Sequence, residues 1–371
     1  MTTTKNNEHK KLNVPNLRFP EFQGEWITYK IKDVLSIGNG RDYKHLSNGE
    51  IPVFGTGGYM TSVDECLYNG ETTFIGRKGS INKPFYYNGK FWTVDTLFYT
   101  HSFNGITPKF TYCLFQTINW LKYNEASGVP SLSKDTIEKI KINIPELEEQ
   151  NKIAKLMFAL DERIATQSKI IEDLKKLKSA IIEKLYKGIQ GTWYSYRQLF
   201  SIINERNKQL EYSNVLSASQ ERGMVSREDL NLDIHFERSN ISTYKIVKNG
   251  DYVIHLRSFQ GGFAFSEKTG ICSPAYTVLR PNNLLVYGYL SNYFTSRDFV
   301  KSLIIVTYGI RDGRSINVDE WLDMKVVIPS KEQQTHIVNV IESIENKIKN
   351  EETYSNCLLN QKQYLLRQMF I

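Results

Sequence analysis

Residues 140–186 read IKINIPELEEQNKIAKLMFALDERIATQSKIIEDLKKLKSAIIEKLY, and residues 324–370 read MKVVIPSKEQQTHIVNVIESIENKIKNEETYSNCLLNQKQYLLRQMF. The two stretches align without a gap at an offset of 184 residues, which places Pro145 on Pro329 and Gln150 on Gln334. A repeat of this length with the same hydrophobic pattern in both copies predicts that the chain is built from two similar halves.

Apolar residues in both copies are spaced alternately by four and three, which is the 3.5-residue period of a coiled coil. The apolar seam runs from Ile153 to Leu185 in the first copy and from Ile337 to Met369 in the second. Polar residues interrupt both seams at the same two places: Gln167 with Glu351, and Lys178 with Lys362. About 40 residues at roughly 1.5 Å each predict a helix of roughly 60 Å. We expect two such helices to pack antiparallel; the alternative is a pair of ordinary amphipathic core helices.

The stretches that precede the two helices are rich in Tyr, Phe, Gly and β-branched residues and contain short strand-like runs. IPVFGTGGYM (51–60) and TTFIGRKGS (72–80) are examples in the first, and GDYVIHLRSFQGG (250–262) lies at a comparable place in the second. The pattern predicts an α+β fold with two similar β-rich globules, two long antiparallel coiled-coil helices and a pseudo-two-fold axis. The predicted segments are a disordered leader (1–14), a first globule (15–145), a central helical spacer (146–190), a second globule (191–329) and a C-terminal helical spacer (330–371).

Composition sets broad limits on the kind of protein. The net charge of +7 is spread evenly along the chain, so it permits nucleic-acid binding without proving it. No apolar run approaches about 18 residues, which argues against a membrane span. The four cysteines are isolated, without a CxxC pair or clustered histidines, and this favours the reducing cytoplasm and argues against a zinc site.

Motifs of catalysis are missing from the sequence. It has no GxxxxGK[ST] phosphate loop and no HxxxH or HExxH pair. Gly55-Thr56-Gly57-Gly58 follows a strand-like run but does not open a helix, so a tight turn is the better interpretation and a nucleotide cradle the weaker one. We therefore expect a non-catalytic chain with no metal or cofactor of its own; an enzyme with an unrecognised fold is the alternative.

The two helices are similar in sequence, whereas the two globules differ. This difference suits two globules that bind different sequences in a long, segmented target such as duplex DNA. Arg reads guanine and Gln or Asn reads adenine, whereas Lys, Ser, Thr and backbone N–H groups hold phosphates. The candidates in the first globule are Arg77, Lys78, Gly79 and Ser80, with Lys44, Tyr59, Trp92 and Thr93 as secondary ones. Those in the second are Gln220, Arg222, Arg257, Ser258, Gln260, Tyr308, Arg311 and Arg314. Surface ion pairing is the alternative for each arginine, and a core position is the alternative for Trp92 and Tyr308.

Apolar residues that lie off the seam are candidates for binding partner proteins. Two copied surfaces related by a two-fold axis suit two identical partners. The candidates are Leu156, Leu177, Ile182, Val340 and Leu366.

Several phrases resemble the specificity (S) subunit of type I restriction-modification systems, from about Leu17 to Ile371. They are IPVFGTGGYM, IGRKGSINKPFYYNGKFWTVDTLF and the two helix openings, IPELEEQNKIAKLMFALDERI and IPSKEQQTHIVNVIESIENKI. The resemblance implies a non-enzymatic subunit whose two target recognition domains read a bipartite, asymmetric DNA site. The implied partners are double-stranded DNA, two adenine-methyltransferase (M) subunits and, in the full complex, restriction (R) subunits.

The resemblance also implies that S-adenosylmethionine binds the partner methyltransferase subunit. The second globule departs from the IGRKGS phrase, since residues 256–261 read LRSFQG, as expected if it reads another sequence. The alternative from a different class is a coiled-coil scaffold protein that does not bind DNA.

Overall fold

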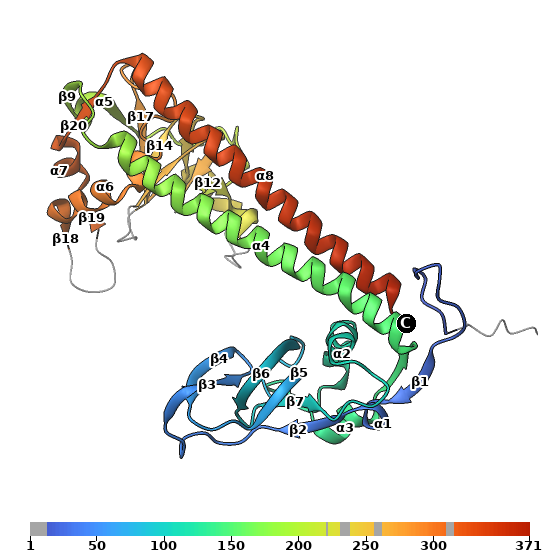
Figure 1. Ribbon diagram of the computed structural model, residues 1–371. Helices are drawn as coiled ribbons and strands as arrows, with labels where there is room; N and C mark the ends of the chain where they lie inside the picture. Colours follow the sequence, from blue (N-terminus) through green and yellow to red (C-terminus); the bar gives the residue numbers. More distant parts are fainter. Residues whose placement is uncertain (1–12, 220–221, 231–237, 256–261, 309–314) are drawn as a thin grey trace, which may run out of the picture. The chain divides into compact units, whose positions relative to one another are not determined.

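The computed structural model describes residues 13–219, 222–230, 238–255, 262–308 and 315–371, of which 230, 238–240, 308 and 315 are described by their backbone alone. The chain divides into two compact units (Figure 1). One comprises the residues up to Ser168 together with Thr353–Ile371, and the other comprises Lys169–Glu352. Each unit therefore contains one β-rich domain, part of the first long helix and part of the second. We call residues 13–144 the first domain and residues 192–328 the second domain.

The first domain is built on a six-stranded sheet with the strand order β2-β7-β5-β6-β3-β4. All neighbours are antiparallel except β3 and β6, which are parallel. Its elements are β1 (Ile27–Lys30), α1 (Ile31–Val34), β2 (Ser36–Asn39), β3 (Asn48–Gly55), β4 (Gly58–Val63), β5 (Tyr68–Gly76), β6 (Phe85–Thr93), β7 (Leu97–His101), α2 (Pro108–Phe115), η1 (Trp120–Tyr123), α3 (Lys134–Lys139) and β8 (Lys141–Ile144). The first long helix, α4, spans Leu147–Tyr186.

The second domain has a four-stranded sheet with the strand order β10-β17-β14-β15 and several two-stranded ribbons. Its elements are β9 (Thr192–Ser195), α5 (Tyr196–Leu199), β10 (Phe200–Ile203), β11 (Leu216–Ser219), β12 (Gly223–Ser226), η2 (Arg227–Leu230), η3 (Arg238–Thr243), β13 (Lys245–Val247), β14 (Tyr252–Ile254), β15 (Phe263–Phe265), β16 (Gly270–Cys272), β17 (Thr277–Pro281), η4 (Tyr293–Thr295), α6 (Arg297–Ser302), η5 (Leu303–Val306), β18 (Thr307–Tyr308), β19 (Ser315–Ile316), α7 (Val318–Asp323) and β20 (Lys325–Ile328). The second long helix, α8, spans Lys331–Met369.

The two domains share a common arrangement of elements. β10, β17, β14 and β15 are paired in the same order as β2, β7, β5 and β6, with every neighbour antiparallel. Just before each long helix, a short helix (α3 or α7) leads into a strand that pairs with the opening strand of the domain, β8 with β1 and β20 with β9. A side chain caps the start of each short helix. The Ser133 side chain accepts a hydrogen bond from the Thr136 N–H in α3, and the Asn317 side chain accepts one from the Glu320 N–H in α7. The domains differ mainly in what is added to this common sheet.

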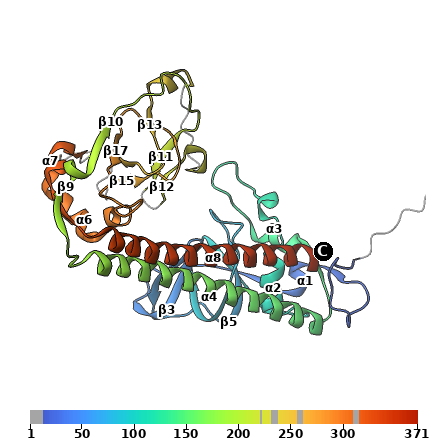
Figure 2. The ribbon, with the colours of Figure 1, turned by 90° about the horizontal axis from the view of Figure 1, so that it is seen from above.

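Within each unit, part of α4 packs antiparallel against part of α8, and the two helices run side by side in both views (Figures 1 and 2). In the first unit Asp161 pairs with Lys362, and the Arg163 guanidinium lies 5.5 Å from the ring centre of Tyr354. In the second unit Lys175 pairs with Glu352 at 2.7 Å, and Lys178 pairs with Glu345 at 2.6 Å. Later residues of α4 thus meet earlier residues of α8. The seam positions of both helices are buried or half-buried, as their period predicts.

The structure changes two details of the sequence-based expectations. Asn13, assigned to the leader, is already tied to the first domain, because its carbonyl accepts a hydrogen bond from Trp26 N at 2.8 Å; residues 1–12 lie outside the described residues. Pro145 and Pro329, whose residue type suits the first turn of a helix, instead precede the helices by two residues. No helix in the described part of the chain is long and apolar enough to cross a membrane.

Candidate nucleic-acid interface

Three segments of the first domain meet at one place on its surface. The hairpin of β3 and β4 turns at Thr56 and Gly57, because Gly55 pairs with Gly58, so this stretch is the tight turn that the sequence favoured. Gly79, in the loop between β5 and β6, donates its N–H to the carbonyl of Pro130 at 2.8 Å. A Cβ on Gly79 would lie 3.8 Å from Thr56 Oγ1, so the hairpin, the β5–β6 loop and the segment around Pro130 are neighbours.

Glycines give the β5–β6 loop its shape. A Cβ on Gly76 would lie 2.5 Å from the carbonyl oxygen of Ser80, so only glycine lets the loop fold back this closely. Gly79 has φ +83°, in the left-handed region that side chains disfavour. The result is a compact loop that carries Arg77, Lys78 and Lys83, all exposed, and no acidic residue. Such a cluster of cations suits contact with phosphates.

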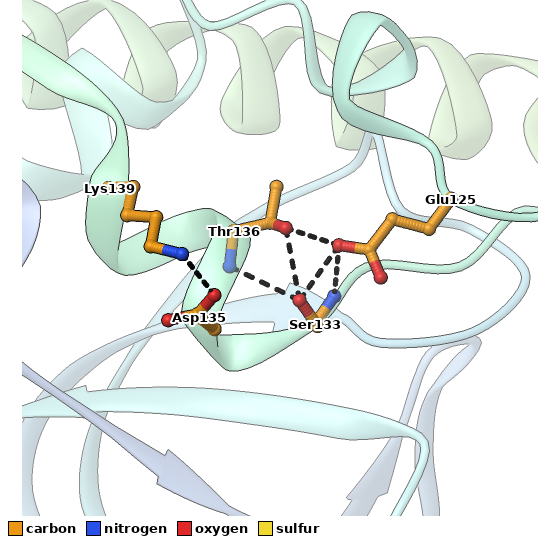
Figure 3. A network of polar contacts seen from close by, with 5 residues as sticks. All are labelled: Glu125, Ser133, Asp135, Thr136 and Lys139. Atoms are coloured by element: carbon orange, nitrogen blue, oxygen red, sulfur yellow. Dashed lines mark hydrogen bonds and ion pairs between the residues drawn. The ribbon is translucent and has the colours of Figure 1, made fainter.

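A hydrogen-bonded network closes the neighbouring loop, residues 124–133, as Figure 3 shows. The Glu125 carboxylate accepts hydrogen bonds from the Ser133 hydroxyl at 2.7 Å, from the Ser133 N–H and from the Thr136 hydroxyl. Hydrogen bonds from Thr136 and then Ser133 lower the pKa of Glu125, because they stabilise its charged form. The loop therefore holds a defined shape and presents Val129, which is 68% exposed, beside the cations of the β5–β6 loop.

The residues predicted from the first globule fall into two groups. Arg77, Lys78 and Ser80 are exposed in the β5–β6 loop, which also contains Gly79, and Lys44 and Tyr59 are exposed on other segments. The Arg77 guanidinium donates to the carbonyl of Asp95 at 3.3 Å, which orients the side chain without pairing its charge.

Trp92 and Thr93 form the second group, because their side chains are only 5% and 0% exposed. The Trp92 indole N–H donates to the carbonyl of Arg41 at 2.9 Å, so it is already satisfied within the domain. We assign both residues to the core, so the prediction that they contact DNA was wrong.

The candidates in the second domain are mostly beyond the described residues. Gln220, Arg257, Ser258, Gln260, Arg311 and Arg314 lie outside them, and only the backbone of Tyr308 is described, in β18. Arg222 is exposed, with its guanidinium 3.5 Å from the carbonyl of Asp229. Arg257 falls in the stretch of sequence between β14 and β15, which are the counterparts of β5 and β6. The loop with Arg77 joins the corresponding pair of strands in the first domain.

The candidate partner-binding residues also fall into two groups, one at least partly exposed and one buried. Leu177 is 50% exposed, and Leu156 and Val340 are half-buried, which leaves apolar surface on both helices. Ile182 and Leu366 are only 6% and 9% exposed and belong to the cores of the second and first domains. Their selection as partner contacts was wrong, because the domains themselves cover these helix positions.

Sequence reasoning missed three residues of the first-domain surface: Glu125, Val129 and Lys83. Val129 stands in the phrase SGVPSLS, where a β-branched residue between Gly128 and Pro130 cannot continue a helix and is a signal for an exposed turn. Among the described residues, no group of three or more His, Cys, Asp or Glu side chains could hold a metal ion.

The fold defines a class of proteins in which two related β-rich domains are joined by two long antiparallel helices. Residues 23–176 match the family model of the type I restriction modification DNA specificity domain. A putative type I specificity subunit of Mycoplasma pneumoniae is 30% identical over 196 residues, which cover 50% of this chain and 60% of that relative. A putative type I restriction enzyme specificity subunit of Methanocaldococcus jannaschii is 23% identical over 92% of this chain and 91% of its own length.

Solved structures agree on the fold. The S subunit of a type I restriction-modification system from M. genitalium superposes with a TM-score of 0.61 over 96% of this chain and 99% of its own, at 13% identity. A chain from a study of complex assembly and conformational transition of the type I R-M system gives 0.60, at 14% identity. Residues 23–176 are therefore similar to the type I DNA specificity domain, and the chain as a whole shares the fold of the solved S subunit.

Proposed function

We propose that this chain is the DNA sequence-recognition subunit of a type I restriction-modification complex. Each domain reads one half-site of a bipartite, asymmetric DNA site, and the chain itself performs no catalysis. One observation carries the proposal: the common sheet arrangement recurs in both domains, whereas the sequence of the corresponding loop changes from IGRKGS to LRSFQG. A repeated frame with two different loops suits the reading of two different sequences.

The chemistry of the first-domain surface supports contact with DNA. Exposed Arg77, Lys78 and Lys83 supply positive charge for phosphates, and Arg77 has the bidentate geometry that reads guanine. Val129 offers an apolar contact of the kind that the thymine methyl group accepts. The proposal therefore assigns both positioning and sequence readout to the segments around Gly79.

Partner subunits supply the chemistry in this proposal. Two adenine-methyltransferase subunits bind, one for each half of the chain, and S-adenosylmethionine is held by them and not by this chain. Restriction subunits join in the full complex. Leu177, with Leu156 and Val340, is part of the helix surface that the methyltransferase subunits contact. The four cysteines are unpaired, which suits work in the reducing cytoplasm.

Two measurements test the proposal. The chain with its co-expressed neighbouring methyltransferase should bind duplex DNA with a log affinity that falls linearly with log salt concentration. Light scattering should give two methyltransferase subunits for each copy of this chain. Salt-independent or undetectable DNA binding by the assembled complex would favour a scaffold role, and a stable one-to-one complex under partner excess would refute the stoichiometry.

A further inference from the structure

A buried glutamine ties the start of α4 to the first domain. Gln150 is 0% exposed. Its Oε1 accepts a hydrogen bond from the backbone N–H of Thr107 at 2.8 Å, and its Nε2 donates to the carbonyl oxygens of Gly105 and Pro145, each at 2.9 Å. One amide therefore satisfies three backbone groups that come from two separate stretches of chain.

The start of α8 has the same connection to the second domain. Gln334 is 1% exposed. Its Oε1 accepts from the N–H of Val286 at 2.8 Å, and its Nε2 donates to the carbonyl oxygens of Leu284 at 3.1 Å and Pro329 at 3.0 Å. The pattern of donors and acceptors is the same as that of Gln150, and each set lies within its own unit.

The segments that the glutamines bind occupy equivalent places in the two domains. Residues 105–107 follow β7 and lead into α2, while residues 284–286 follow β17, the counterpart of β7. Each glutamine thus connects the segment that leaves the recognition sheet, the proline turn before the long helix, and the helix itself. Only an amide fits, because a carboxylate would face two carbonyl oxygens and an apolar side chain would leave all three groups unpaired.

We infer that Gln150 and Gln334 are positioning residues, each of which fixes the angle between a recognition domain and its long helix. This inference rests on the proposed function, since the angle matters when two domains must reach two half-sites at a set distance. The glutamines touch no base in this scheme. They set which gap between the half-sites the protein accepts.

The test maps methylated adenines in cells that carry the chain and its neighbouring methyltransferase. Gln150→Glu and Gln334→Glu keep the size of the side chain but replace the donor. We expect methylation at sites whose gap differs by one base pair to rise at least about tenfold relative to the original gap, because each variant loses the two hydrogen bonds that the amide Nε2 donates, and one buried hydrogen bond alone corresponds to about tenfold. Glu148→Gln and Glu332→Gln, exposed in the same helical turns, should leave the gap unchanged.

The outcomes separate the inference from the proposed function. If the unaltered chain yields no bipartite methylated site, the proposed function fails. If the unaltered chain yields such a site, two results would overturn the positioning role. In one, the variants methylate only sites with the original gap; in the other, they lose methylation at all gaps in proportion to their unfolded fraction. Should a glutamate variant not fold, Gln150→Met and Gln334→Met provide the same comparison, because methionine matches the length and carries no charge.

Discussion

Lys362 of α8 forms an ion pair with Asp161 of α4, and the contact recurs with the helices exchanged, between Lys178 of α4 and Glu345 of α8. Both lysines interrupt an apolar seam, where an unpaired ammonium is costly. If the repeats packed in parallel register, Lys178 would face Lys362. The two pairs therefore favour the antiparallel arrangement and disfavour the parallel one.

Removing the more buried lysine should destabilise the protein most. The side chain of Lys362 is 12% exposed and that of Lys178 is 27% exposed. We expect Lys362→Ala to lower the free energy of unfolding by about 1–3 kcal/mol, because it leaves a partly buried carboxylate unpaired, and Lys178→Ala to lower it less. Urea denaturation measures both. Lys175→Ala is the control, since its pair with Glu352 is exposed and should contribute less than about 1 kcal/mol; an equal loss there would contradict the assignment.

Single arginine substitutions should affect one half-site each. Arg77→Ala should weaken preference for one half-site by about 1–3 kcal/mol, the value of a good bidentate base contact, and Arg257→Ala should do so for the other. Fluorescence anisotropy with duplexes altered in one half-site at a time distinguishes the two. Trp92→Phe is a control, because this buried residue should change stability and leave base preference unaltered. If Arg77→Ala weakened the preference for both half-sites equally, the assignment of one half-site to each domain would be wrong.

The loop closed by Glu125 should open in acid. Its pKa is lowered from the ordinary value of 4.5 by hydrogen bonds from Thr136 and Ser133, so the stabilisation is fully present above pH 4.5 and is lost as pH falls through the lowered pKa. The chemical shift of the Ser133 amide, followed by NMR, should report this transition. Glu125→Gln should abolish it and Asp135→Asn should not. A midpoint at or above pH 4.5 would refute the network.

Two of the four cysteines should be reactive in the native protein. Cys66 and Cys357 are exposed, whereas burial raises the pKa of Cys113 and of Cys272 to about 12 in each case. Mass spectrometry after maleimide treatment at neutral pH should find label on the two exposed thiols, and on all four after unfolding. Rapid native labelling of Cys113 would show that the core of the first domain opens.

The repeat in the sequence was sufficient to predict the long helices, because their seam depends only on the spacing of apolar residues along one element. It also paired Gln150 with Gln334 and Lys178 with Lys362 before any contact was known. The strand-rich domains and the loop of Arg77 followed from local composition and glycine placement. These features are local, and local patterns are what a single sequence displays.

Only the tertiary structure decided which of these residues are covered. Ile182 and Leu366 lie off the seam, yet the domain cores bury them, and Trp92 lies in a strand next to a candidate loop, yet it points inward. Gln150 looks like any polar residue in a first helical turn, and its role depends on Thr107, which is 43 residues away. Burial and hydrogen bonding join residues distant in the chain, so the sequence determined the period of the helices, and folding decided which side chains are buried and what they bind.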